Sequence, residues 1–177
     1  MVQQPRNSIK LIPGKHTVIN IKSPLGKLNL KISGNDNPYN GINCIVKSNN
    51  QNSILNVQKM NTNKQYLVGS YDLEVLSIPR IKFKDVKINQ SKMTDIVIPL
   101  YGSIQVNKSD GPAALFLKDK GKNIWVYDFN EERSIENLNI QPGNYFICFR
   151  SNRSNSIAHT ILKDFKITSA QNINFKL

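Results

Sequence analysis

Apolar and polar residues alternate along most of the chain, with the period of two that half-buried β-strands have. In one example, Leu28, Leu30 and Ile32 alternate with polar neighbours, and Ile104 and Val106 repeat the pattern later. Clusters of Gly, Pro, Asn and Asp interrupt the alternation about every eight to twelve residues. No segment keeps the 3.6-residue period of an amphipathic helix. The pattern predicts an all-β chain of short strands.

The pattern occurs twice, at an offset of roughly 75–80 residues. Residues 16–34 align with residues 93–111, so that Gly26 falls near Gly102. We therefore expect two tandem, internally repeated β-sandwiches of the immunoglobulin-like or transthyretin-like kind. The predicted modules cover residues 1–88 and residues 89–177, and a last strand at residues 173–177 is expected to complete a sheet of the second module.

One phrase marks the repeat most clearly. "VGSYDLEVLSIPRI" at residues 68–81 has the same pattern as "PGNYFICFRSNRSN" at residues 142–155. In both, a Gly precedes a Tyr and an alternating strand; the markers are Gly69, Tyr71, Gly143 and Tyr145. We expect each Tyr ring to pack inward while its hydroxyl reaches a loop carbonyl at the end of the sandwich.

The chain has 177 residues and a net charge of +12, most of it in the first half. Residues 1–89 hold 13 basic and 4 acidic residues, whereas residues 90–177 hold 11 and 8. Alternating lysines indicate solvated strand faces and edges, with an anion-binding face as the alternative; they are Lys22, Lys27, Lys31, Lys82, Lys84 and Lys87. Neither an aromatic–basic stacking motif nor a basic helix is present, which argues against a nucleic-acid partner.

The two cysteines, Cys44 and Cys148, lie in different halves and have no CxxC partner. We expect free, buried thiols, each within its own module. No apolar run of about 18 residues is present, so no membrane span is predicted. The start of the chain has no apolar signal-peptide region, as would also hold for a segment of a longer exported protein.

Motifs for catalysis or metal binding are missing from the sequence. Its two histidines are His16 and His159, and no nucleophile elbow, HExxH or P-loop occurs. The oxygen-rich loop at residues 33–41 resembles a calcium loop but lacks the downstream Glu, so an ordinary turn explains it. We predict a protein that is not an enzyme and that has no metal site and no cofactor.

An aromatic stripe offers the one candidate ligand site. Alternation places Trp125, Tyr127 and Phe129 on one strand face, where they could stack against sugar rings or contact a protein. The repeat favours another interpretation, because Leu55 and Val57 align with Trp125 and Tyr127. We expect this face to be packed in the core or between the two modules, and the ligand platform is the alternative.

The order of these segments resembles a known family. "GKHTVINIKSPLGKLNLKISG", the stretch from "IVKSNNQ" to "SIPRI", "IQPGNYFICFRS" and the final "KDFKITSAQNINFKL" are similar to the region after the von Willebrand factor A domain in secreted Gram-negative bacterial proteins. The Pro-Gly-x-Tyr strand also resembles carboxypeptidase-regulatory and transthyretin-like surface modules. The metal-binding Asp-x-Ser-x-Ser motif of the A domain does not occur, so the resemblance assigns no ligand residues.

The resemblance implies a non-catalytic interaction or spacer module in the periplasm or at the cell surface, with an A domain upstream. Its partner would be a protein or a polysaccharide. Two alternatives stay open: a pair of carbohydrate-binding modules for cell wall or exopolysaccharide, and a basic accessory protein that binds nucleic acid, motivated by net charge alone.

Overall fold

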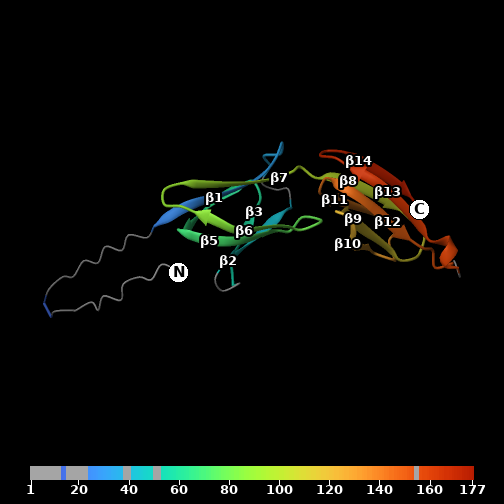
Figure 1. Cartoon of the computed structure of the whole chain (residues 1–177), viewed down its shortest axis with the longest axis horizontal. Helices are drawn as coiled ribbons and strands as arrows, with labels where there is room; N and C mark the ends of the chain where they lie inside the picture. Colours follow the sequence, from blue (N-terminus) through green and yellow to red (C-terminus); the bar gives the residue numbers. More distant parts are fainter. Residues whose placement is uncertain (1–12, 15–23, 38–40, 50–52, 154–155) are drawn as a thin grey trace.

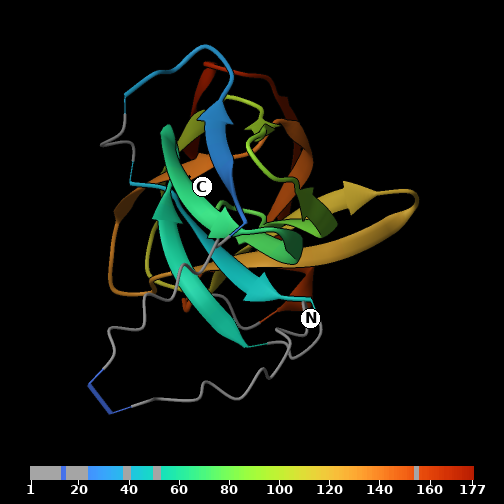
Figure 2. The same cartoon turned by 90° about the vertical axis from the view of Figure 1, so that its left-hand side faces the viewer.

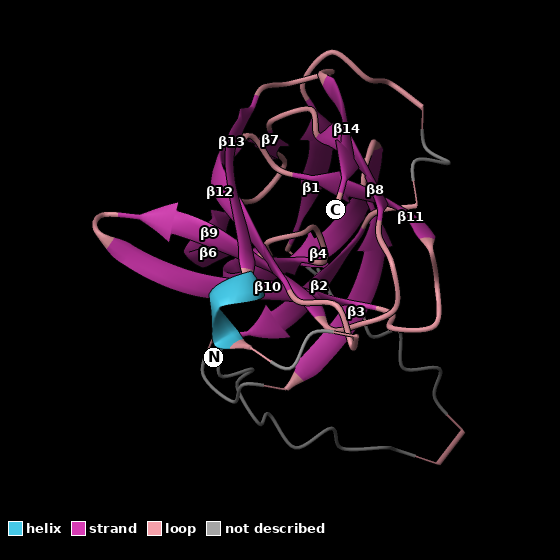
Figure 3. Cartoon of the chain, turned by 90° about the vertical axis from the view of Figure 1, so that its right-hand side faces the viewer, coloured by secondary structure: helices cyan, strands magenta, loops and turns pink. Residues whose placement is uncertain are grey.

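The computed structural model describes residues 13–14, 24–37, 41–49, 53–153 and 156–177. Within this part of the chain there are strands and a single 3-10 turn, η1 (Ile157–His159), drawn as a short helix in Figure 3. The strands are β1 (Leu25–Ile32), β2 (Asn43–Ser48), β3 (Ile54–Lys59), β4 (Thr62–Leu67), β5 (Gly69–Val75), β6 (Ile81–Ile88), β7 (Met93–Ile98), β8 (Gly102–Asn107), β9 (Ala113–Asp119), β10 (Lys122–Phe129), β11 (Ile135–Ile140), β12 (Gly143–Phe149), β13 (Ile161–Ile167) and β14 (Asn172–Lys176). The predicted all-β fold is confirmed.

The strands form two sandwiches of the same design, which lie one after the other along the long axis in Figure 1. The first sandwich consists of a three-stranded sheet, β4-β1-β7, and a four-stranded sheet, β3-β2-β5-β6. The second consists of β11-β8-β14 and β10-β9-β12-β13. Each strand of the second sandwich occupies the place of the strand seven positions earlier, so the predicted repeat is present in the structure.

Each sandwich has its own apolar core between its two sheets. In the first core, Leu28 and Leu30 from one sheet join Leu73 and Val75 from the other, and all four are buried. The second core is assembled in the same way and contains Ile104, Val106, Ala113, Leu115, Phe129, Leu138, Ile140, Tyr145, Ile147, Phe149, Ile167 and Phe175. Alternation thus places one side of every strand inward, as the sequence predicts.

The two marker tyrosines make the same interaction in the two sandwiches. The hydroxyl of Tyr71 donates a hydrogen bond to the carbonyl of Leu67 at 2.7 Å, and that of Tyr145 to the carbonyl of Gln141 at 2.8 Å. Both rings are buried, and burial raises the pKa of both phenols. The prediction made from the repeated phrase is confirmed.

Gly26 and Gly102 occupy equivalent positions in the two sandwiches, and the same steric constraint applies to both. A Cβ on Gly26 would overlap the side chain of Ile88, and a Cβ on Gly102 would overlap that of Ile167. In both sandwiches the last strand of the large sheet therefore passes too close to the first strand for any other residue.

The structure corrects the predicted boundary at residue 88/89. Strand β7 pairs in parallel with β1, from Lys27 opposite Met93 to Ile32 opposite Ile98, so it belongs to a sheet of the first sandwich. The sheets of the two sandwiches separate between Ile98 and Gly102. Strand β14 pairs in parallel with β8 in the same manner, which confirms that the end of the chain completes the second sandwich.

The two sandwiches contact each other through a loop as well as through the chain connection. In the loop between β5 and β6, the side chain of Ile78 packs against the second core. The backbone N–H of Gln141 donates to the carbonyl of Ile78 at 2.7 Å. This loop is the green segment that reaches toward the second sandwich in Figure 1. Two points of attachment restrict the motion of one sandwich relative to the other.

Candidate functional site

The register of the strands identifies the true counterpart of Trp125. Trp125 lies opposite Phe116 across β10 and β9, and Ile54 lies opposite Lys47 across β3 and β2. Each pair is next to a β-bulge, at the same place in the two sandwiches. Ile54 is therefore the counterpart of Trp125, and the sequence alignment, which chose Leu55, was wrong by one residue.

The three residues of the predicted stripe do not share one face. Trp125 is 57% exposed, Tyr127 is half-buried and Phe129 is buried. The bulge after Trp125 inserts Val126, so the alternation is interrupted and Tyr127 points inward with Phe129. The interpretation that Trp125 packs in the core is wrong.

Tyr127 and Phe129 have structural roles. Their rings meet edge to face, with centroids 5.4 Å apart, and Tyr127 packs against the core that contains Phe129. The Tyr127 hydroxyl donates to the buried carboxylate of Glu136 at 2.8 Å. Burial, and then this carboxylate, raise the pKa of Tyr127. We therefore remove both residues from the candidate ligand site and keep Trp125.

Trp125 belongs to an outward-facing group on β10, β9 and β12 that we call the aromatic face: Trp125, Phe116, Phe146, Ala114 and Cys148. The register makes Phe116 the neighbour of both Trp125 and Phe146. The rings of Phe116 and Phe146 are stacked, with centroids 4.9 Å apart and planes 6° apart. The sequence-based prediction missed Phe116 and Phe146, although alternation places both opposite to the inward residues of their strands, and the bulge conceals that Trp125 lies on the same face.

The indole of Trp125 is held in place. Its Nε1–H donates to Oδ1 of Asp128 at 2.8 Å, and Asp128 lies beyond the bulge on the same strand and on the same outward face of the sheet. Figures 2 and 3 show that the hairpin of β9 and β10 projects beyond the body of the sandwich. The exposed indole is thus oriented by one hydrogen bond, on a strand of this hairpin.

The thiol of Cys148 also lies on this face. Cys148 is half-buried and pairs with Ala114, whereas Cys44 is buried in the first core. Both thiols are free, but the expectation that each is buried holds for Cys44 alone. Burial raises the pKa of Cys44 to about 11.

A shallow hollow of about 450 Å³ adjoins the aromatic face. Its floor includes Ala114, Phe116 and Cys148. The lining also includes four residues with polar side chains, which we call the border of the hollow: Asp128, Glu131, Arg150 and Thr160. A mostly apolar lining with a few polar groups is typical of small-molecule sites, and the volume is within their usual range of about 300–1,000 Å³.

The first sandwich has charged residues where the second has this face. Strand pairing makes Lys47 the counterpart of Phe116, Asp72 that of Phe146 and Glu74 that of Cys148. Because one copy of the fold places charges at these positions, the fold itself does not require apolar residues there. The aromatic face is therefore a property of the second sandwich that the packing of its core does not explain.

The two carboxylates on this face of the first sandwich are paired with basic side chains. Glu74 accepts hydrogen bonds from Lys47 at 2.7 Å and from Arg80 at 2.9 Å, and Asp72 accepts one from Lys84 at 2.6 Å. These bonds, that from Lys47 first, lower the pKa of Glu74 to about 2. This face of the first sandwich is therefore a network of ion pairs, and Lys84 is the member of the alternating lysines that takes part in it.

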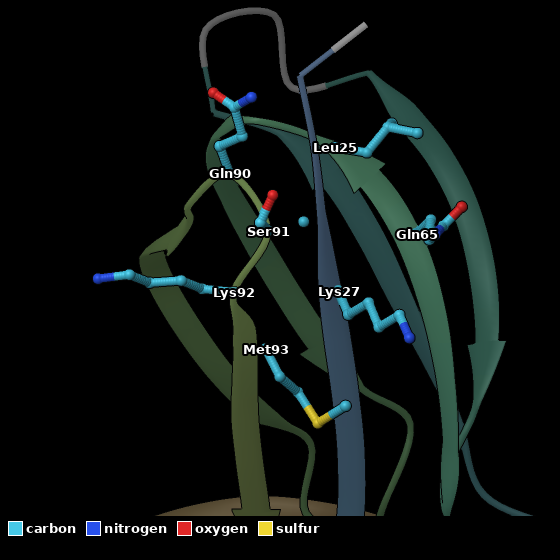
Figure 4. A pocket seen from close by; sticks show the side chains of 8 residues that line it. Leu25, Lys27, Gln65, Gln90, Ser91, Lys92 and Met93 are labelled. Atoms are coloured by element: carbon cyan, nitrogen blue, oxygen red, sulfur yellow. The ribbon is translucent and has the colours of Figure 1, made fainter.

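Another hollow, of about 470 Å³, lies where β1 meets β4 and β7 and is lined by Leu25, Lys27, Gln65, Met93 and the turn before β7 (Figure 4). Its basic side chains are Lys27 and Lys92, which extend in different directions in Figure 4. Because these two side chains do not converge on one point, this hollow is a weak candidate for an anion-binding site.

The structure does not bring the remaining candidate residues together into a metal or catalytic site in the part of the chain that it describes. Within residues that the structure describes, no group of three or more His, Cys, Asp and Glu side chains could hold a metal ion. His159 is exposed in η1, and His16 lies outside the described residues. In the loop at residues 33–41, the side chain of Asn35 accepts from the N–H of Asn37, as in an ordinary turn; residues 38–40 are not described. No helix among the described residues is long and apolar enough to cross a membrane.

Comparison with known proteins gives low similarity. No family model and no curated protein matches the chain. Among solved structures, the chain is similar to the Bacillus anthracis TIE protein (11% identity, TM-score 0.34, covering 87% of this chain and 34% of that one). It is also similar to a streptococcal ancillary pilin (8% identity, TM-score 0.38, covering 88% of this chain and 63% of that one). The chain thus spans less than two thirds of either protein, and scores at this level carry no argument about function.

Proposed function

We propose that the chain is a non-catalytic interaction module, outside the cytoplasm, that binds its partner through the aromatic face of the second sandwich. One observation carries the proposal. At equivalent positions of a repeated fold, the first sandwich has charges and the second has Phe116, Phe146 and Cys148, with Trp125 beside them. An exposed aromatic group that the fold does not need is what a binding surface requires.

The energetics of association favour this assignment. Trp and other aromatic residues dominate the residues whose truncation costs binding most, because a large, nearly rigid ring loses little conformational freedom when it is covered. Trp125 is already oriented by Asp128 and projects on a hairpin, so little further ordering is needed when a partner binds.

The location is part of the same proposal. The resemblance of the sequence to the region that follows von Willebrand factor A domains supports an accessory module of a larger exported protein. The double attachment between the sandwiches, through Ile78 and through residues 99–101, supports a stiff spacer that holds the aromatic face at a distance from an upstream domain.

The test exchanges the two faces within one protein. The triple variant Phe116→Lys, Phe146→Asp and Cys148→Glu gives the second sandwich the residues of its sister, which the same fold accepts. We expect the parent to be retained on isolated Gram-negative cell envelopes and the triple variant to lose at least about tenfold in affinity, which corresponds to about 1.4 kcal/mol.

The matched control is Ile54→Ala, which truncates the counterpart of Trp125 in the first sandwich and should leave retention unchanged. Circular dichroism should show the same sheet content for all three proteins. Equal retention of the parent and the folded triple variant would contradict the proposal, as would no retention of the parent.

A further inference from the structure

We propose that the partner of the aromatic face is a neutral polysaccharide, whose sugar rings stack on Trp125 and enter the adjoining hollow. This inference rests on the proposed function and adds the chemical class of the ligand. It is carried by the position of an oriented indole next to a hollow whose floor is apolar and whose border is polar.

The indole fits one side of a sugar ring. A pyranose presents an apolar C–H face and a polar edge, and aromatic faces attract the slightly positive hydrogens of such a face because of their quadrupole. Trp125 is 57% exposed, and its N–H is already bonded to Asp128. Its open surface is therefore the apolar ring face, which suits stacking and offers no donor of its own.

The hollow fits the polar edge of a neighbouring sugar. Sugar hydroxyls both donate and accept hydrogen bonds, so they need acceptors and donors together. Asp128 and Glu131 supply carboxylate acceptors, Arg150 supplies guanidinium donors and Thr160 supplies both. The floor made by Ala114 and Cys148 would receive the apolar side of the same ring.

The charges around the hollow select a neutral chain. Two carboxylates face one guanidinium there, so a uronic-acid or sulfated chain would meet net repulsion. On the neighbouring part of the aromatic face, Lys118 lies over the ring of Phe146 and is paired with Asp164 at 2.7 Å. It is therefore not available to offset the repulsion.

The border of the hollow also distinguishes a glycan from a protein. The centre of a protein–protein interface is depleted of charged residues, because covering an unpaired charge with an apolar surface is costly. Here Asp128 stands between Trp125 and the hollow, within the patch itself. A hydroxyl-rich ligand can donate further hydrogen bonds to this carboxylate, whereas an apolar protein surface would leave it with the Trp125 N–H as its donor.

The test is affinity electrophoresis of the full chain in gels that contain one polysaccharide each. Neutral β-glucan, α-glucan, mannan and galactan are compared with polygalacturonate and hyaluronan, at two salt concentrations. We expect at least one neutral polysaccharide to retard the parent, Trp125→Ala to weaken that retardation at least about tenfold, and Ile54→Ala to leave it unchanged. Arg150→Gln should weaken it without altering the unfolding midpoint.

The possible results of the two experiments distinguish a failure of this inference from a failure of the proposed function. If cell envelopes retain the parent and not the triple variant, but no neutral polysaccharide retards the parent, the inference is overturned and the aromatic face binds a protein. Retardation by the anionic polysaccharides alone, lost at the higher salt, also overturns it. If a neutral polysaccharide retards the parent and Trp125→Ala equally, the glycan does not bind at the aromatic face.

Discussion

Ile54 and Trp125 occupy the same position in the two sandwiches, each next to a β-bulge and each exposed on the outer face of the larger sheet. Their exposed fractions are 62% and 57%, so neither side chain is needed to fill a core. The difference between them, an aliphatic residue beside Lys47 in one copy and an indole beside Phe116 in the other, is a difference in surface chemistry on a constant fold.

The first prediction concerns stability. Trp125→Ala should lower the free energy of unfolding by no more than about 1 kcal/mol, because a largely exposed side chain loses one surface hydrogen bond and its contact with Phe116. Phe129→Ala, on the same strand but buried, should cost about 3–5 kcal/mol. Urea unfolding curves measure both. Equal losses for the two variants would show that Trp125 is structural after all.

A second prediction concerns the tyrosine hydroxyl. Tyr145→Phe keeps the ring but leaves the carbonyl of Gln141, which accepts from this hydroxyl, without its donor. Leaving a buried acceptor unpaired should cost about 1–3 kcal/mol. Tyr71→Phe removes the matching bond to Leu67 in the first sandwich and serves as the comparison. Urea midpoints equal to that of the parent for both variants would contradict the structural role of this bond.

A third prediction concerns pH, because the ion pairs of Glu74 should stabilise the folded state less in acid. Lys47 and Arg80 hold the pKa of Glu74 at about 2, below its ordinary value of 4.5, so the folded state binds a proton less readily than the unfolded state. The stabilisation is therefore complete above about pH 4.5 and is lost as the pH falls toward 2. Glu74→Gln should be less stable than the parent at pH 7, and the difference should shrink in acid. A constant difference from pH 7 to pH 3 would exclude this origin.

Another prediction concerns the joint between the sandwiches. Ile78→Ser removes the apolar contact of the β5–β6 loop with the second core. We expect small-angle X-ray scattering to show a broader distribution of interatomic distances, because one of two attachments is weakened. Leu76→Ser is the matched control, since Leu76 lies in the same loop and is exposed. Identical scattering of Ile78→Ser and the parent would mean that residues 99–101 alone fix the arrangement.

The sequence predicts much of this architecture because alternation and turn residues are local signals. The repeated phrase around Tyr71 and Tyr145 predicts their inward rings and their hydrogen bonds, and the repeat itself predicts the second sandwich. The position of β7 is not a local property. Alternation at residues 93–98 fits either sandwich, and the parallel pairing with β1, which lies more than sixty residues earlier, decides between them.

The prediction of the candidate site differs from the structure for a similar reason, since it depends on a feature that local alternation does not reveal. A strict period of two places Trp125, Tyr127 and Phe129 together, and one inserted residue, Val126, separates Trp125 from the other two. No residue at this bulge signals its presence, since neither Gly nor Pro occurs there. The outward direction of Phe116 and Phe146 does follow from alternation, but their stacking requires the register between β9 and β12.

The emission of Trp125 tests the central claim most directly, because it is the single tryptophan of the chain. In the free protein the exposed indole should be readily quenched by acrylamide. On titration with cell envelopes, the account predicts a shift of the emission to shorter wavelength and a marked loss of quenching. The triple variant, which keeps Trp125 but exchanges its neighbours, should show neither change. A parent protein that is retained on the envelopes while its emission and quenching stay the same would contradict the assignment of the aromatic face as the binding surface.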